Sequence, residues 1–123
     1  MAWSKVVPSV LGLVSLGYRH RLRCIKIRGG NTAFSFCQGL AKSGYIGGVM
    51  KVPGGLIVRL VYRSGVLGRH GYKVYNAKSP IYAPYKSLGR ADGLILYTNV
   101  GFLTGPECKM RGCGGFLVCF LSS

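Results

Sequence analysis

Acidic residues are almost absent from this chain of 123 residues. Asp92 and Glu107 stand against 17 lysines and arginines, which gives a formal net charge of +15 at pH 7. Hydrolysis by paired carboxylates needs two acids tuned apart in one site, and oxygen-ligand Ca²⁺ or Mg²⁺ sites also need carboxylates. The composition therefore argues against a carboxylate-pair hydrolase and against a calcium- or magnesium-binding protein.

Long hydrophobic runs are also missing. The longest, Val6–Tyr18, is interrupted by Pro8, Gly12 and Gly17. It falls short of the roughly 20 apolar residues that span a bilayer, so we expect no membrane insertion. At the same time, 49% of the residues are hydrophobic and the mean hydropathy is +0.30, which excludes a disordered basic tail and predicts a folded core.

Cysteine spacing lacks the regularity of a disulfide framework or a metal site. The five cysteines are Cys24, Cys37, Cys108, Cys113 and Cys119, and no CxxC pair occurs among them. This odd, irregular set favours free thiols in a reducing compartment and predicts no bound metal. His20 and His70 both sit among cations, so a nucleophile–base pair would lack an orienting carboxylate. We expect no enzyme activity, no cofactor and no small-molecule substrate, with a thiol-dependent enzyme using Cys108 or Cys113 as the minority alternative.

Positive charge is concentrated in the first half of the chain. Residues 1–63 carry ten cations and no acid, whereas residues 64–123 carry seven cations and both acids. Five cations fall close together: Arg19, Arg21, Arg23, Lys26 and Arg28. Because no acid lies near to balance them, we expect these side chains to contact phosphate. The partner predicted from charge alone is a polyanion, either nucleic acid or an anionic membrane.

Hydrophobic periodicity divides the first half into five short elements. The pattern predicts a helix over 8–18, a strand over 23–28, a helix from Asn31 or Thr32 to Lys42, and strands over 45–51 and 56–62. In the last of these strands Leu56, Val58 and Leu60 share one face. The first half therefore reads α-β-α-β-β.

The second half is predicted to be mostly strand. The glycine-rich segment 64–71 is the best candidate boundary, and strands are predicted over 72–76, 93–97 and 116–121. Thr104 and Glu107 have the spacing of a capping box, which predicts a short helix ended by Gly112. The expected fold is α+β in two small lobes, residues 1–66 forming the α-β-α-β-β lobe and residues 67–123 the β-rich lobe with one short helix.

Residues 93–104 read GLILYTNVGFLT and are followed by Glu107, Gly112 and the pair Gly114-Gly115. This gapless pattern resembles the C-terminal signature of the universal small-subunit ribosomal protein eight, the S-eight family. That signature runs from an apolar strand through a Ser/Thr loop, a glycine, two apolar residues and a threonine to a short helix and a Gly-Gly pair. Residues 69–75 (RHGYKVY) and 43–46 (SGYI) resemble two further elements of the family.

The resemblance implies that the loop over 97–101 and the Gly114-Gly115 turn lie side by side and contact RNA. This chain departs from the family there: Tyr97 and Asn99 replace two loop serines, and Phe116 replaces a carboxylate. We therefore expect close backbone approach to carry more of the contact than side chains. The residues predicted to bind RNA, from the charge cluster and the resemblance together, are Arg19, Arg21, Arg23, Lys26, Arg28, Arg69, Lys73, Tyr75, Tyr97, Thr98, Asn99, Gly101, Gly114 and Gly115.

The family resemblance implies a structural, non-catalytic function in translation. Proteins of this family bind the central domain of small-subunit rRNA and support ribonucleoprotein assembly, so the expected partners are small-subunit rRNA and neighbouring ribosomal proteins. The acid-poor, cysteine-bearing composition suggests a mitochondrial version, with a plastid or bacterial source as the alternative. A basic membrane-associated subunit of another organellar complex is the rival interpretation from a different class.

Overall fold

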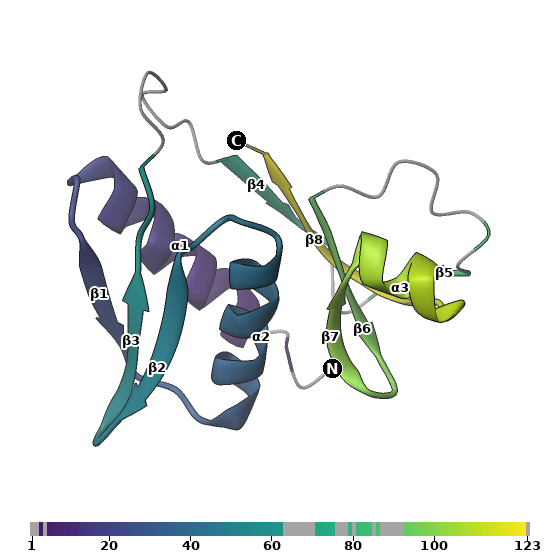
Figure 1. The fold of residues 1–123 in the computed structure, drawn as a ribbon, viewed down its shortest axis with the longest axis horizontal. Coiled ribbons are helices and arrows are strands. Elements are labelled where there is room, and N and C mark those ends of the chain that lie inside the picture. The colour runs from purple at the N-terminus through teal and green to yellow at the C-terminus, as the bar shows by residue number, and fades with distance from the viewer. Residues whose placement is uncertain are drawn as a thin grey trace.

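The structure is a computed structural model that describes Trp3, residues 5–62, 71–75, Ser79, residues 81–84, Lys86 and residues 93–122. Within these residues the chain forms three helices and two antiparallel sheets (Figure 1). This arrangement confirms the predicted α+β class with two small lobes. The predicted boundary near residue 66 and the predicted contact residue Arg69 lie outside the described residues.

The N-terminal lobe has the predicted α-β-α-β-β order. Its elements are α1 (Val6–Arg19), β1 (Cys24–Ile27), α2 (Asn31–Lys42), β2 (Gly48–Val52) and β3 (Gly55–Arg59). The strands form one sheet in the order β1-β3-β2, with β3 in the centre and both pairings antiparallel. Both helices supply apolar side chains to the core beside this sheet, such as Leu11 from α1 and Phe36 from α2.

Two strand boundaries in this lobe differ from the prediction. The segment after α2 was expected to be extended from residue 45, but Tyr45 and Ile46 are buried in the core before β2 begins at Gly48. The central strand was expected to continue to residue 62, but β3 ends at Arg59. Leu60 stays buried beyond the strand, and its N–H donates to the Arg23 carbonyl at 2.8 Å. The hydrophobic pattern thus identified the buried face and overestimated the length of regular pairing.

The C-terminal lobe is built around the long strand β8 (Gly115–Ser122). Its other elements are β4 (Gly71–Val74), β5 (Tyr82–Ala83), β6 (Leu94–Thr98), β7 (Gly101–Thr104) and α3 (Gly105–Arg111). The sheet runs β4-β8-β6-β7, and β5 also pairs with β8. All these pairings are antiparallel, so the lobe is β-rich with one short helix, as predicted.

The segment predicted as a loop over 97–101 is instead the tip of a β-hairpin. Strands β6 and β7 pair through Leu96 with Leu103 and through Thr98 with Gly101, leaving only Asn99 and Val100 in the turn. Strand β7 was not predicted, because the apolar stretch after Gly101 is too short to show a period of two before the helix cap. Pairing with β6 decides that it is a strand.

One cluster of buried side chains runs through both lobes. It includes residues of α1 and α2 together with Ile95, Phe102 and Val118 from the second sheet. The rings of Phe36 and Phe102 meet edge to face with centroids 5.2 Å apart, so α2 packs directly on β7. In Figure 1, helix α2 accordingly lies between the two sheets.

Candidate nucleic-acid interface

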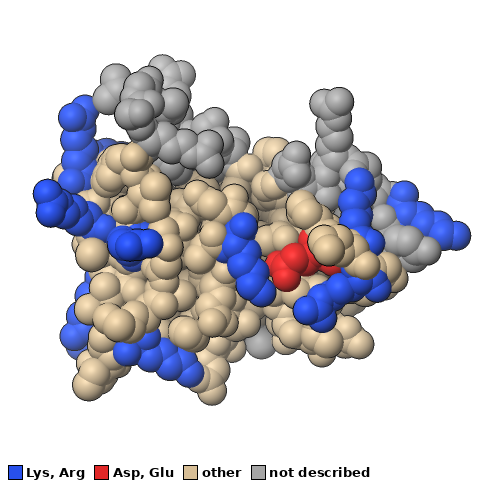
Figure 2. All heavy atoms as spheres, in the orientation of Figure 1, with Lys and Arg blue, Asp and Glu red and all other residues tan. Residues whose placement is uncertain are grey.

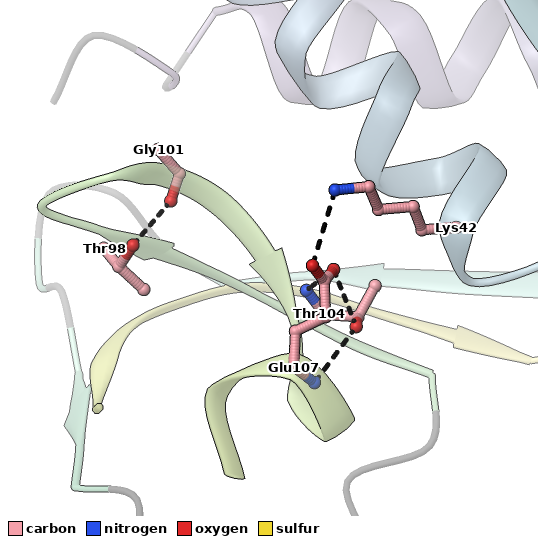
Figure 3. A network of polar contacts seen from close by, with 5 residues as sticks. All are labelled: Lys42, Thr98, Gly101, Thr104 and Glu107. Carbon is pink, nitrogen blue, oxygen red and sulfur yellow. Dashed lines mark hydrogen bonds and ion pairs between the residues drawn. The ribbon is translucent and has the colours of Figure 1, made fainter. Parts of the chain in front are cut away.

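The start of α3 is fixed by the predicted capping box (Figure 3). The Thr104 hydroxyl accepts from the Glu107 N–H at 3.4 Å, and the Glu107 carboxylate accepts from the Thr104 N–H at 3.3 Å. The other carboxylate oxygen accepts from Lys42 Nζ of α2, also at 3.4 Å. The sequence prediction of this cap is confirmed, and the Thr104 hydroxyl is occupied by it.

The pKa of Glu107 is lowered by these neighbours. Partial burial acts in the opposite direction and is the largest single influence, but the hydrogen bonds from Thr104 and the positive charge of Lys42 together outweigh it. The carboxylate is therefore ionised at neutral pH and stabilises the N-terminal end of α3. The Glu107 carboxylate thus contacts Thr104 in its own lobe and Lys42 in the N-terminal lobe.

The hairpin tip also uses its polar side chain internally. The Thr98 hydroxyl donates to the Gly101 carbonyl at 2.9 Å (Figure 3). It also accepts from the Val100 N–H at 3.2 Å. Thr98 is 6% exposed, so its hydroxyl braces the turn and is not presented outward. Gly101 has φ 104°, a conformation that other residues rarely adopt. The polar side chain left facing solvent at this tip is that of Asn99.

Gly114 and Gly115 lie against backbone of the same lobe. A Cβ atom on Gly115 would fall 2.7 Å from the Tyr97 carbonyl oxygen, and one on Gly114 would fall 2.4 Å from the Ala83 carbonyl oxygen. Neither approach leaves room for a side chain, so the glycines are required by strand packing. Packing within the protein therefore explains why both positions are glycine, without a close approach of RNA. What the two glycines achieve is to bring the strands β5, β6 and β8 together.

An open groove of about 630 Å³ lies where these segments meet. Its described lining consists of Tyr82, Pro84, Tyr97, Thr98, Asn99, Gly112, Cys113, Gly114, Gly115 and Phe116. The lining thus brings together the hairpin tip and the glycine pair, as the resemblance implied, although the glycines are held there by internal packing. Its size is typical of a site for a nucleotide-sized group.

The groove is aromatic and carries no charged side chain among its described lining residues. Tyr82 and Phe116 meet edge to face with centroids 5.5 Å apart, and Tyr82 is 58% exposed. Tyr82 was not predicted as a contact residue, because only the two-residue pairing of β5 with β8 brings it to this place. Phe116 was expected only to lack the carboxylate found in the family, whereas its ring lines the groove beside Tyr82. Such a site suits a base or ribose better than a phosphate.

The clustered cations lie on the other lobe, away from the groove. All five are exposed. Arg19 is the last residue of α1, and Lys26 points outward from β1. The others lie in the connections on either side of β1: Arg21, Arg23 and Arg28. In Figure 1, β1 and α3 stand at opposite ends of the long axis. Figure 2 shows blue side chains at both ends of this face, with one red patch among those near α3. The structure therefore does not gather all the predicted contact residues into one site.

The remaining predicted contact residues fall outside the groove lining. Lys73 is exposed on β4, and its Nζ lies 5.6 Å from the ring centre of Tyr75, which is half-buried. Gly101 is half-buried, and a Cβ there would fall 3.7 Å from the Ser35 hydroxyl of α2. These residues thus form neither a continuation of the groove nor part of the cation cluster.

The cysteines are unpaired thiols. Burial raises the pKa of Cys37, Cys108 and Cys119 to about 12 in each case, so these three are almost entirely protonated at neutral pH. Cys24 is exposed on β1, and Cys113 is half-buried in the groove wall. No cluster of three or more possible metal-ligating side chains occurs within the described ranges.

In the part of the chain that the structure covers, no helix has the length and apolar character needed to cross a membrane. Comparison with protein-family models and with curated protein sequences finds no match to this chain.

Proposed function

We propose that this protein is a structural RNA-binding component of a small ribosomal subunit, of the S-eight type, which binds the central domain of small-subunit rRNA. The observation that carries the proposal is the meeting of the hairpin tip and the glycine pair in one groove. These are the two segments whose sequence resembles the RNA-contacting signature of that family. The net charge of +15 supplies the attraction to a polyanion.

The two surfaces suit different parts of an RNA. The groove, with Tyr82, Phe116 and Asn99, can stack on and hydrogen-bond to an unstacked base or a ribose. The cations of α1 and β1 can neutralise phosphates some distance away along the same molecule. This division favours a folded RNA with an irregular internal loop over a short single strand.

The proposed setting is a mitochondrial ribosome, with neighbouring ribosomal proteins covering part of the remaining surface. The composition supports an organellar version because the chain is poor in acids and carries five free cysteines. No catalytic step is part of the proposal, which concerns rRNA binding and assembly of the small subunit.

Salt-dependent binding tests the proposal. The affinity for a hairpin from the central domain of small-subunit rRNA is measured between roughly 50 and 200 mM salt, where each neutralised phosphate contributes about −0.7 to −0.9 to the log–log slope. We expect a slope of several units. Replacing Arg19, Arg21 and Arg23 by Gln should make the slope shallower. A flat salt response would contradict RNA binding.

Asn99→Ala is the matched variant at the groove. It removes one uncharged hydrogen-bonding group, so we expect affinity to fall at every salt concentration by about 1 kcal/mol, roughly fivefold, without a change in slope. An unchanged affinity would show that the RNA does not occupy the groove, even if the cations bind it.

Exposed leucines support a second candidate, binding to an anionic membrane surface. Leu13 and Leu16 of α1 are 40% and 45% exposed, and Leu22 beyond the helix is 45% exposed, close in sequence to the cations at 19–28. Apolar side chains beside cations are typical of interfacial helices. Flotation with anionic vesicles in the absence of RNA, lost in Leu13→Gln/Leu16→Gln, would favour this candidate.

A further inference from the structure

The end of helix α3 brings two cysteines together. Gly112 adopts a left-handed conformation with φ 65°, and its N–H donates to the Lys109 carbonyl at 3.2 Å. The Cys113 N–H donates to the Cys108 carbonyl at 3.0 Å. These two bonds form a Schellman motif, in which the side chains at the ends of the longer bond commonly contact each other. Here both of those side chains are thiols.

The two thiols touch but differ in exposure. Cys113 packs on a small cluster formed by Leu96, Leu103 and Cys108, and the nearby Cys113 thiol contributes to the raised pKa of Cys108. Cys108 is 0% exposed, whereas Cys113 is half-buried and lines the groove. An accessible thiol backed by a buried one is suited to reaction with an external disulfide, because the second thiol can resolve the first product.

We propose that Cys113 and Cys108 form a thiol–disulfide exchange site whose co-substrate is a small disulfide such as oxidised glutathione. The Cys113 thiolate attacks one sulfur of the small disulfide, giving a mixed disulfide and one free small thiol. The Cys108 thiolate then attacks the Cys113 sulfur and releases the second small thiol. The two cysteines lose two electrons and two protons in total, and the small disulfide gains both.

The second step limits the rate at neutral pH. The pKa of Cys108 is raised to about 12, first by burial and then by Cys113 and Glu107, with Arg111 acting in the opposite direction. The side chains that pack on Cys108 from β6 and β7 are leucines and carry no charge. Since only the thiolate attacks, closure of the internal disulfide accelerates as the pH rises.

Mass spectrometry tests the exchange site directly on the full chain. The background carries Cys24→Ser, because Cys24 is exposed and would react independently. With oxidised glutathione we expect a transient glutathione adduct, followed by loss of the mass of two hydrogen atoms, faster at alkaline than at neutral pH. Trypsin cleaves after Lys109 and Arg111, so the internal disulfide appears as two peptides joined covalently.

Single substitutions separate the two thiols. Cys108→Ser should stop at the glutathione adduct on Cys113, and Cys113→Ser should leave the buried Cys108 unmodified while the protein stays folded. An adduct that never closes in the background protein would overturn the proposal, as would equal modification of both variants. Circular dichroism of each variant before treatment shows whether the lobe is intact.

A second arm rests on the proposed RNA-binding function. Because Cys113 lines the groove, bound RNA should slow formation of the glutathione adduct in Cys108→Ser. If RNA binds and the adduct forms at the same rate, the groove is not the RNA site. The exchange chemistry measured without RNA then still stands, so the two failures are distinguishable.

Discussion

The Glu107 carboxylate accepts hydrogen bonds from three donors at the junction of the two lobes. They are the Thr104 N–H, the Thr104 hydroxyl and Lys42 Nζ, at 3.3, 3.1 and 3.4 Å. In a chain with two acids this carboxylate has an internal, structural use, which explains its presence without invoking chemistry. Its effect on stability follows from its pKa.

Stability should fall on acidification through the titration of Glu107. The pKa of Glu107 is lower in the folded protein than its ordinary value of 4.5, so its contribution is present above that value and is lost as the pH falls through the folded-state pKa. Glu107→Gln should remove this part of the pH dependence. Chemical denaturation at a series of pH values measures it, and parallel pH profiles for the two proteins would contradict the assignment.

The cap itself is tested by Thr104. Thr104→Ala removes the hydroxyl that accepts from the Glu107 N–H, and we expect a loss of about 0.5–2 kcal/mol in the free energy of unfolding. Thr104→Ser keeps the hydroxyl and is the matched control. RNA affinity, measured on the folded fraction, should stay the same in both variants.

Close backbone contact makes Gly115 intolerant of a side chain. A Cβ at Gly115 would lie 2.7 Å from a backbone oxygen, whereas one at Gly48 of β2 meets nothing within 4 Å. Gly115→Ala should therefore destabilise the protein by about 1–3 kcal/mol. Gly48→Ala, the matched control, should be neutral or stabilise by up to about 1 kcal/mol because it restricts the unfolded chain. Equal effects in thermal denaturation would disprove the contact argument.

At the scale of elements, the β6–β7 hairpin depends on the Thr98 hydroxyl. It satisfies the Gly101 carbonyl and the Val100 N–H, so Thr98→Val, which keeps the shape, should cost about 1 kcal/mol of stability. Hydrogen exchange should speed up at the hairpin amides first. If Thr98→Val kept full stability and lost RNA binding, the hydroxyl would be a direct RNA contact instead of a brace.

Elements with strong local signals were predictable, and the two short strands β5 and β7 were not. The cap at Thr104 and Glu107 is a pattern of adjacent residues, so the start of α3 could be read from the sequence. Strands β5 and β7 are short, with two and four residues, and no periodicity can identify them. Their positions follow from hydrogen bonds to β8 and β6, which lie elsewhere in the chain.

At the scale of the whole molecule, the shared core predicts that the lobes unfold together. Phe102 of β7 is 7% exposed and meets Phe36 of α2, so Phe102→Ala should cost about 3–5 kcal/mol. Fluorescence of Trp3, which is buried in the same core, and hydrogen exchange in β6 should report one transition. Val100→Ala, at a position 61% exposed, is the control. Two separate transitions would show that the lobes are independent.

The candidate RNA site was predictable only in part. The sequence, through its resemblance to the S-eight family, implied that the loop over 97–101 and the pair Gly114-Gly115 lie side by side, and residues 97–99 and both glycines line the groove. It could not show that the Thr98 hydroxyl is used by its own turn or that the glycines touch protein backbone, because both depend on contacts across the sheet. The basic cluster at 19–28 was also expected to contact the same RNA, but those residues lie on the N-terminal lobe, away from the groove.

The charge, the α+β order and the helix cap could all be predicted from the sequence, because charge depends only on composition, while periodicity and capping depend on residues close together along the chain. The pairing of β5 and β7, the aromatic rings at the groove and the contact between two of the five thiols become visible only in the folded chain. The Cys108–Cys113 contact shows the difference: a spacing of five matches no recognised motif, but the left-handed turn at Gly112 folds the helix end so that the two side chains touch. Contacts of that kind depend on backbone direction, which composition does not encode.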